Sequence, residues 1–224
     1  PLDSITHCSK NVFLCAHPTG RTIGGAVWKI RHGATEVVYA MGINLKKEIV
    51  LEGADLSVLP PSPALMIVEG AGATSGPQQR QSRKDRVDDM SRVIASAVET
   101  LRKGSNVLIP CETGGRILEI LKAFDKHWAG HKLSVYHLAF VSHMAVNVME
   151  FAKSQLEWMN DALLKDFYNG RANPFALQFV KLFTSVREME KKCPGPKVVF
   201  ATDASLTCGL SKEVLLRWGG DPRC

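Results

Sequence analysis

The chain has 224 residues, of which 45% are hydrophobic and 22% are charged, and its formal net charge is +6. This globular composition suits one large domain or two lobes, and the basic charge suits an acidic partner such as RNA without requiring one. No run of about 18 apolar residues occurs, which argues against a transmembrane helix, and the scattered cysteines form no CxxC pair, which argues against a zinc or disulfide framework.

The first part of the chain has the pattern of strands joined by tight turns. Residues 11–16 predict one strand, and the apolar alternation over 18–45 predicts a β-hairpin with its turn near 31–34. Three prolines then precede the apolar run 64–68. A short apolar run bounded by chain breakers predicts a strand that is buried on both faces.

From residue 64 onward, strand and helical patterns alternate. Such alternation predicts an α/β fold with a mainly parallel sheet covered by helices. The predicted helices are 82–102, 116–127, 142–159 and 211–218, the last with Ser211 as its N-cap, and the predicted strands are 106–110, 133–141, 179–183 and 197–201.

Two segments in the predicted hairpin carry a resemblance to a known family. Residues 18–30 are PTGRTIGGAVWKI, and residues 36–48 are EVVYAMGINLKKE. They resemble metallo-β-lactamase-type nucleases of the β-CASP family, in which a Gly-His-x-Leu/Ile-Gly turn precedes a strand and the histidine binds zinc. In those nucleases the next strand ends in an aspartate that bridges two metal ions. Here Arg21 stands at the histidine position and Gly42 at the aspartate position.

The residues at these two positions argue against metal binding. Arginine is a permanent cation without a lone pair to donate, and glycine has no side chain. Glu69 matches the acid that opens the β-CASP region and supports the metal centre in active relatives. Because a buried carboxylate needs a partner, we expect Glu69 to form a salt bridge with Arg21. We therefore predict no catalytic residue, no metal ligand and no cofactor in this chain.

Further segments extend the resemblance from residue 12 to residue 223. The strand, Gly-Arg turn and helix over 106–119 match the family, and 147–159 (NVMEFAKSQLEWM) matches best its non-nuclease branch. The resemblance implies a portion of a metallo-β-lactamase lobe over 1–70 and an incomplete β-CASP lobe over 71–224. We expect the chain to be an internal fragment, with the family's HxHxDH motif upstream of it and the late histidine motifs downstream.

Basic residues are the candidates for contact with RNA. A run at the start of the first predicted helix alternates with aspartates, which is also typical of a solvated helix face. An arginine after the Gly114–Gly115 turn fits either a structural role or the RNA path, and this turn could also place a nucleotide phosphate at a helix N-terminus. The candidate RNA-binding residues are Arg80, Arg83, Lys84, Arg86 and Arg116.

The resemblance implies a non-catalytic pseudo-nuclease scaffold in the nuclear complex that cleaves and polyadenylates pre-mRNA 3′ ends. Its expected partners are the active endonuclease subunit, other polyadenylation factors and pre-mRNA, with no membrane partner. One alternative is an active zinc-dependent RNA endonuclease of the same fold, and another is a nucleotide-using small-molecule enzyme. The pseudo-nuclease of the Integrator complex is a third alternative, which the Gly-Gly-x-x-Trp-Lys-Ile string at 24–30 disfavours.

Overall fold

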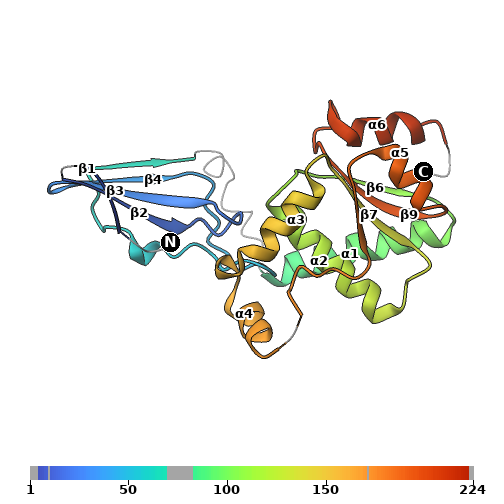
Figure 1. Cartoon of the computed structure of the whole chain (residues 1–224), viewed down its shortest axis with the longest axis horizontal. Helices are drawn as coiled ribbons and strands as arrows, with labels where there is room; N and C mark the ends of the chain where they lie inside the picture. Colours follow the sequence, from blue (N-terminus) through green and yellow to red (C-terminus); the bar gives the residue numbers. More distant parts are fainter. Residues whose placement is uncertain (1–4, 10, 70–82, 171, 222–224) are drawn as a thin grey trace. The chain divides into compact units, whose positions relative to one another are not determined.

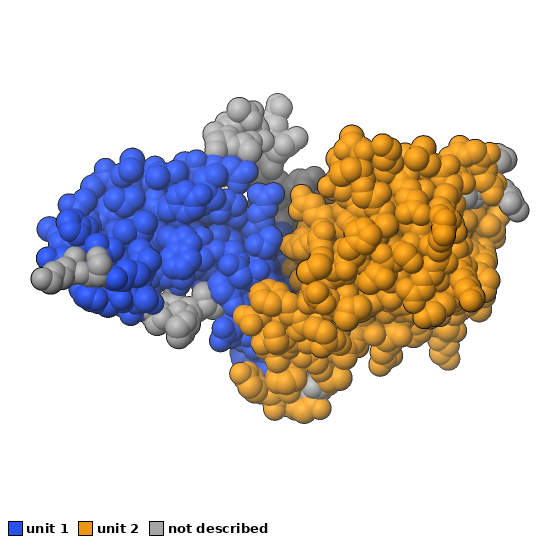
Figure 2. Space-filling view, turned by 45° about the horizontal axis from the view of Figure 1, so that its top comes forward, with its two compact units in different colours: residues 1–83, 157–165 blue, residues 84–156, 166–224 orange. Residues whose placement is uncertain are grey.

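The computed structural model describes residues 5–9, 11–69, 83–170 and 172–221, with only the backbone of residues 9 and 83–88. The chain divides into two compact units, coloured separately in Figure 2. Unit 1 comprises residues 1–83 together with 157–165, and unit 2 comprises 84–156 and 166–224. The predicted lobe boundary at 70/71 lies outside the described residues. The membership of 157–165 in unit 1 was not predicted.

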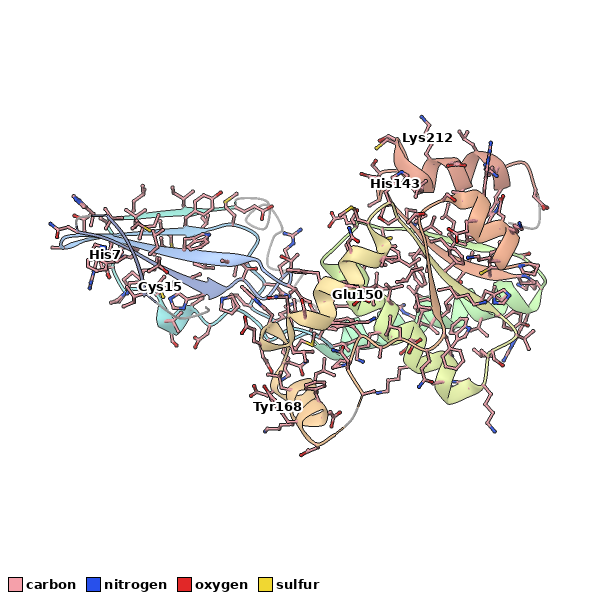
Figure 3. All side chains as sticks on the ribbon, viewed as in Figure 1. His7, Cys15, His143, Glu150, Tyr168 and Lys212 are labelled. Atoms are coloured by element: carbon pink, nitrogen blue, oxygen red, sulfur yellow. The ribbon has the colours of Figure 1, made fainter. Side chains whose placement is uncertain are left out.

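Unit 1 is built on a five-stranded sheet in the order β1-β2-β3-β4-β5. Its first four strands are antiparallel neighbours, and β5 runs parallel to β4. Ile5 on β1 pairs with Cys15 on β2, and the His7 ring meets a neighbouring phenylalanine edge-on (Figure 3). The strands are β1 (Ile5–Ser9), β2 (Val12–Pro18), β3 (Ala26–His32), β4 (Thr35–Ala40) and β5 (Leu65–Val68), with a short 3-10 helix η1 (Leu56–Val58) before β5. The predicted hairpin is confirmed as β3 and β4.

The burial predicted for the strand at 64–68 is wrong. All four residues of β5 are exposed, and Leu65 and Val68 each keep 53% of their accessible surface. The strand pairs only with β4 among the described residues, so it forms an edge of the sheet. An apolar run with chain breakers on both sides indicates a strand, but it does not report whether other elements cover the strand's faces.

Unit 2 is built on four parallel strands in the order β6-β9-β7-β8, and the predicted parallel sheet is confirmed for these strands. The strand at 64–68, which the alternating pattern also included, belongs to the sheet of unit 1 instead. Figure 1 shows α5 and α6 on one face of this sheet and α1, α2 and α3 on the other. The strands are β6 (Val107–Pro110), β7 (His137–Val141), β8 (Val180–Phe183) and β9 (Lys197–Ala201). The helices are α1 (Arg83–Arg102), α2 (Arg116–His131), α3 (Ala145–Ser154), η4 (Leu156–Trp158), α4 (Asp161–Tyr168), α5 (Val186–Lys192) and α6 (Gly209–Trp218). No helix in the described ranges is long and apolar enough to cross a membrane.

The central strand β9 is buried along its whole length because helices cover both of its faces. Its Val199 and Ala201 join one apolar cluster with Val186 of α5 and Leu210 of α6. Phe200 points to the opposite face, where its ring meets Phe124 of α2 edge-on at 5.1 Å between centroids. This two-sided burial explains the continuous apolar run of the strand.

The continuous helix predicted over 142–159 is wrong. The chain forms α3, then η4, then α4, and the break coincides with the segment that joins unit 1. Within α3, Met149 and Ala152 are buried, whereas Phe151 is 50% exposed. Ser211 is not the N-cap of the last helix: Cys208 is, and the Ser211 hydroxyl donates to the Asp203 carbonyl inside the first turn.

Candidate functional site

Three positions that are distant in sequence meet at one carboxylate in unit 1. Arg21 Nη1 lies 3.6 Å from Glu69 Oε2, and the backbone N–H of Gly42 donates to the same oxygen at 3.1 Å. Arg21 lies in the turn after β2, Gly42 follows β4 and Glu69 follows β5. The predicted Arg21–Glu69 salt bridge is therefore confirmed, and the two positions expected to have lost metal ligands lie beside it.

The ion pair lies at the surface rather than in the core. The side chains of Arg21 and Glu69 are 58% and 40% exposed, so the expectation that Glu69 is a buried carboxylate is wrong. The acid follows an edge strand and retains contact with solvent for that reason. An exposed ion pair contributes about 0–1 kcal/mol of stability, because water screens the charges in both states.

Replacing Glu69 with glutamine is expected to lower the free energy of unfolding by less than about 1 kcal/mol. The matched comparison is Glu36→Gln, which breaks a pair with Lys29 at 3.2 Å whose side chains are only 29% and 27% exposed. Urea denaturation of both variants measures the difference. A larger loss of unfolding free energy for Glu69→Gln than for Glu36→Gln would contradict this expectation and show that the Arg21–Glu69 pair stabilises the fold.

The turn that carries Arg21 is held by hydrogen bonds to the loop after β4. The Asn44 N–H donates to the Thr19 carbonyl at 2.8 Å, and the Asn44 side chain donates to the Gly20 carbonyl at 3.3 Å. Within the turn, Thr19 and Gly25 bond through their backbones, and the Arg21 N–H donates to the Thr19 hydroxyl. Asn44 was part of the family pattern, but its role as the link between turn and loop was not predicted.

The residues at this site do not fit a divalent metal ion. Only Glu69 offers lone pairs, whereas the Arg21 guanidinium places a fixed positive charge beside them. A Cβ built on Gly42 would lie 3.6 Å from Arg21 Cδ and 4.0 Å from Glu69 Oε2. A side chain at position 42 would therefore lie beside the Arg21–Glu69 pair. Across the described residues, no cluster of three or more histidine, cysteine, aspartate or glutamate side chains could hold a metal.

The Gly-Arg turn of unit 2 joins β6 to α2. Gly115 has a φ of 70° and caps α2 without a side-chain hydrogen bond, which is the close turn expected there. Arg116 begins the helix and is exposed, and its guanidinium makes no hydrogen bond or ion pair with another described residue. Burial raises the pKa of the neighbouring Cys111 thiol to about 12, so this cysteine is not a nucleophile at neutral pH.

The structure describes little of the other basic candidates. Arg80 lies outside the described residues, and the side chains of Arg83, Lys84 and Arg86 in the first turn of α1 are also outside the description. Further along α1, Arg92 forms an ion pair with Asp89, as expected for a solvated helix face with mixed charges. The RNA-binding role of these residues stays a prediction.

Comparison with known protein families identifies the domains to which the two parts of the chain correspond. A Metallo-beta-lactamase superfamily domain matches residues 3–67, and a Beta-Casp domain matches residues 117–224. The chain belongs to the metallo-β-lactamase/β-CASP family. The first match contains Arg21 and Gly42, and the second contains nearly all of α2 and the parallel sheet other than β6. The predicted fold class, with a metallo-β-lactamase sheet followed by a parallel β-CASP sheet, is confirmed.

Within this metallo-β-lactamase/β-CASP family, the chain is a homologue of cleavage and polyadenylation specificity factor subunit 2. It is 34% identical over 218 residues to that protein from Arabidopsis thaliana, covering 96% of the chain and 28% of the relative. It is 37% identical over 205 residues to the probable subunit 2 of Drosophila melanogaster, covering 90% and 26%. Endoribonuclease YSH1 of Yarrowia lipolytica is 26% identical over 215 residues, with 96% and 25% covered. The chain thus spans about a quarter of the length of these relatives.

Proposed function

We propose that the protein is a non-catalytic member of the metallo-β-lactamase/β-CASP family that acts as a scaffold in pre-mRNA 3′-end cleavage and polyadenylation. The observation that carries the proposal is the Arg21–Glu69 ion pair beside Gly42. The acid that would support a metal centre is turned toward an arginine instead. The turn keeps its geometry, but Arg21 places a cation where a metal ligand would lie. Such a fold can still bind partners, but this site cannot activate water on a metal ion.

The homology supports this proposal over the two alternative enzymes. Identity to subunit 2 of the specificity factor is 34% and 37%, compared with 26% to an endoribonuclease of the same family. The nucleotide-using enzyme rested on the Gly114–Gly115 turn alone, and a turn with two glycines at the start of a helix is a weak signal for a nucleotide site.

The experiment that tests the proposal is an RNA cleavage assay. The purified protein is incubated with a radiolabelled pre-mRNA that contains a polyadenylation site, in the presence of zinc. We expect no cleavage above the level seen with a chelator. Cleavage that requires zinc and disappears with Glu69→Gln would overturn the proposal and support the active endonuclease.

The proposed partners follow from the same assignment. We propose that the protein pairs with the active endonuclease subunit and with other polyadenylation factors in the nucleus, and that it contacts pre-mRNA through phosphate attraction. Such contact would be independent of sequence and would weaken as salt concentration rises, because each neutralised phosphate releases counterions.

Arg116→Ala is expected to reduce RNA affinity. It should also make the fall of log affinity with log salt concentration shallower by about 0.7 to 0.9, the contribution of one phosphate contact. Arg116 is the described candidate that is exposed and makes no hydrogen bond or ion pair with another described residue. The matched control is Arg187→Ala, which removes an exposed arginine from α5. Electrophoretic mobility shifts at several salt concentrations measure the slope. Equal slopes for the two variants would remove Arg116 from the RNA-binding surface.

A further inference from the structure

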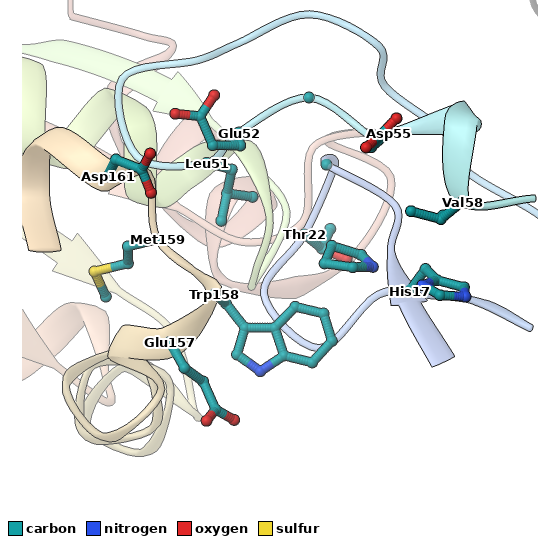
Figure 4. Close-up of a pocket in the computed structure, with 13 residues that line it drawn as sticks. His17, Thr22, Leu51, Glu52, Asp55, Val58, Glu157, Trp158, Met159 and Asp161 are labelled. Carbon is teal, nitrogen blue, oxygen red and sulfur yellow. The ribbon is translucent and has the colours of Figure 1, made fainter. Parts of the chain in front are cut away.

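Unit 1 contains a cavity of ≈ 480 Å³ whose lining does not include Arg21, Gly42 or Glu69. Three segments form it: the end of β2 with the turn that follows, the loop 51–58 and the segment 157–161. In Figure 4 the Trp158 indole extends from the last segment toward the turn that carries Thr22 and toward His17. A cavity of this size is in the range that proteins use for small ligands and for anchoring side chains.

The cavity has an apolar lining and an acidic border. Leu51, Val58, Trp158 and Met159 supply the apolar surface, and the acids are Glu52, Asp55, Glu157 and Asp161. Among the described residues that line the cavity, none is a lysine or an arginine. The border is acidic although the whole chain carries a net charge of +6. The local charge therefore opposes the charge of the protein as a whole.

The wall that carries Trp158 is fixed by hydrogen bonds within unit 1. Asn160 donates from its backbone to the Val50 carbonyl at 2.8 Å and from its side chain to the Ile49 carbonyl at 2.6 Å. Met159 forms a β-bridge with Leu51, and Asn160 is 3% exposed. These contacts fix the backbone next to Trp158 before a ligand arrives, which reduces the entropy lost on binding.

The four acids differ in the partners that they already have. Lys47 pairs with Glu52, and Asp55 accepts a hydrogen bond from the Ser57 N–H at 2.8 Å. Hydrogen bonds from Ser57 lower the pKa of Asp55, so it stays ionised at neutral pH. Glu157 and Asp161 are exposed and form no ion pair with any described residue. Their charges face solvent at the border of an apolar, aromatic-lined cavity.

We propose that this cavity is a docking site for an arginine side chain on an extended segment of a protein partner. The planar guanidinium stacks on the indole face of Trp158 and donates to Glu157 and Asp161, while its methylene stem covers the apolar lining. The acidic border excludes RNA phosphates by repulsion, so a basic protein segment is the occupant that the charge favours. The proposal goes beyond the scaffold function and does not depend on the absence of catalysis.

The test uses two labelled peptides, Gly-Ser-Leu-Arg-Leu-Ser-Gly and the same peptide with citrulline, the neutral isostere of arginine. Fluorescence anisotropy measures the affinity for the 224-residue chain, and the NMR signal of the Trp158 indole N–H, assigned by its loss in Trp158→Leu, locates the site. We expect the arginine peptide to bind at least about tenfold more tightly than the citrulline peptide. We also expect saturable movement of the indole signal.

Variants complete the test. Glu157→Gln and Trp158→Leu are each expected to weaken the arginine peptide by about tenfold. Glu112→Gln removes the same charge from an exposed position in unit 2 and is expected to leave affinity unchanged. Because Glu157 is exposed, its substitution leaves the fold intact, and circular dichroism checks this for each variant. Equal affinity for the two peptides, or no saturable binding at millimolar peptide, would overturn the proposal. So would a loss of affinity in Glu112→Gln as large as that in Glu157→Gln. Self-association of the protein that Trp158→Leu abolishes would also overturn it, because a second copy would then occupy the cavity.

Discussion

Replacing Gly20 with alanine is expected to destabilise unit 1 by about 2–5 kcal/mol. Gly20 has a φ of 70°, a conformation that costs a residue with a Cβ about 1–2 kcal/mol. A Cβ there would also lie 2.5 Å from the Asn44 carbonyl oxygen and 2.6 Å from the Ala54 nitrogen. Both atoms belong to the backbone and to the hydrogen bond between Ala54 and Asn44, so they cannot move aside without breaking it. Such overpacking adds about 1–3 kcal/mol.

Gly33→Ala separates the two causes. Gly33 has a φ of 58° but no heavy atom within 4 Å of the position that a Cβ would take. Its substitution is expected to cost only the backbone term, about 1–2 kcal/mol. Urea denaturation of both variants measures the difference between them. Equal destabilisation would mean that the turn at Gly20 is not held against the loop after β4, and the geometry of the Arg21 site would lose its support.

Asn160→Ala is expected to destabilise the attachment of residues 157–165 to unit 1 by about 3 kcal/mol. The change removes the side-chain donor to the Ile49 carbonyl and the acceptor that caps the Leu163 N–H at the start of α4. Each of the two lost hydrogen bonds costs about 1 kcal/mol, and the partly buried Ile49 carbonyl left without this donor adds about 1 kcal/mol. Urea denaturation measures the loss, and limited proteolysis reports whether the segment 157–165 becomes accessible.

The matched control is Asn173→Ala in unit 2. Asn173 also donates to a carbonyl, that of Lys153 at 3.0 Å, and accepts from a backbone N–H two residues later. It is less buried than Asn160, so its substitution is expected to cost less and to leave proteolysis of 157–165 unchanged. New cleavage in that segment with Asn173→Ala, or none with Asn160→Ala, would contradict the role given to Asn160.

Local patterns predicted the regular elements of this fold. Apolar and polar residues alternate in β3 and β4, and β9 is a short apolar run. Turn residues bound each of these strands, so the local sequence was sufficient to place them. The exposure of β5 and the break after α3 depend on contacts with segments far along the chain. The run at 64–68 looks the same whether its faces are covered or open. The 142–159 pattern could not show that residues after 156 leave one unit for the other.

The candidate site divides in the same way. The meeting of Arg21, Gly42 and Glu69 was expected because a family pattern places their counterparts around one centre. The structural roles of Asn44 and Asn160 were not predicted, because their side-chain hydrogen bonds run to backbone carbonyls of segments far away in the sequence. The cavity beside Trp158 was missed for the same reason, since its walls come from three separate stretches of sequence.

The zinc content of the purified protein shows whether the site at Arg21, Gly42 and Glu69 binds a metal ion. Mass spectrometry of the metals after dialysis against zinc is expected to find no zinc attributable to the Arg21 site, so that Glu69→Gln leaves the zinc content unchanged. The double variant Arg21→His with Gly42→Asp provides the control, because it adds two donor groups beside the Glu69 carboxylate and is expected to retain more zinc than the natural chain. One zinc ion per natural chain that is lost in Glu69→Gln would contradict the account, because the arginine would then not have replaced the chemistry of the site.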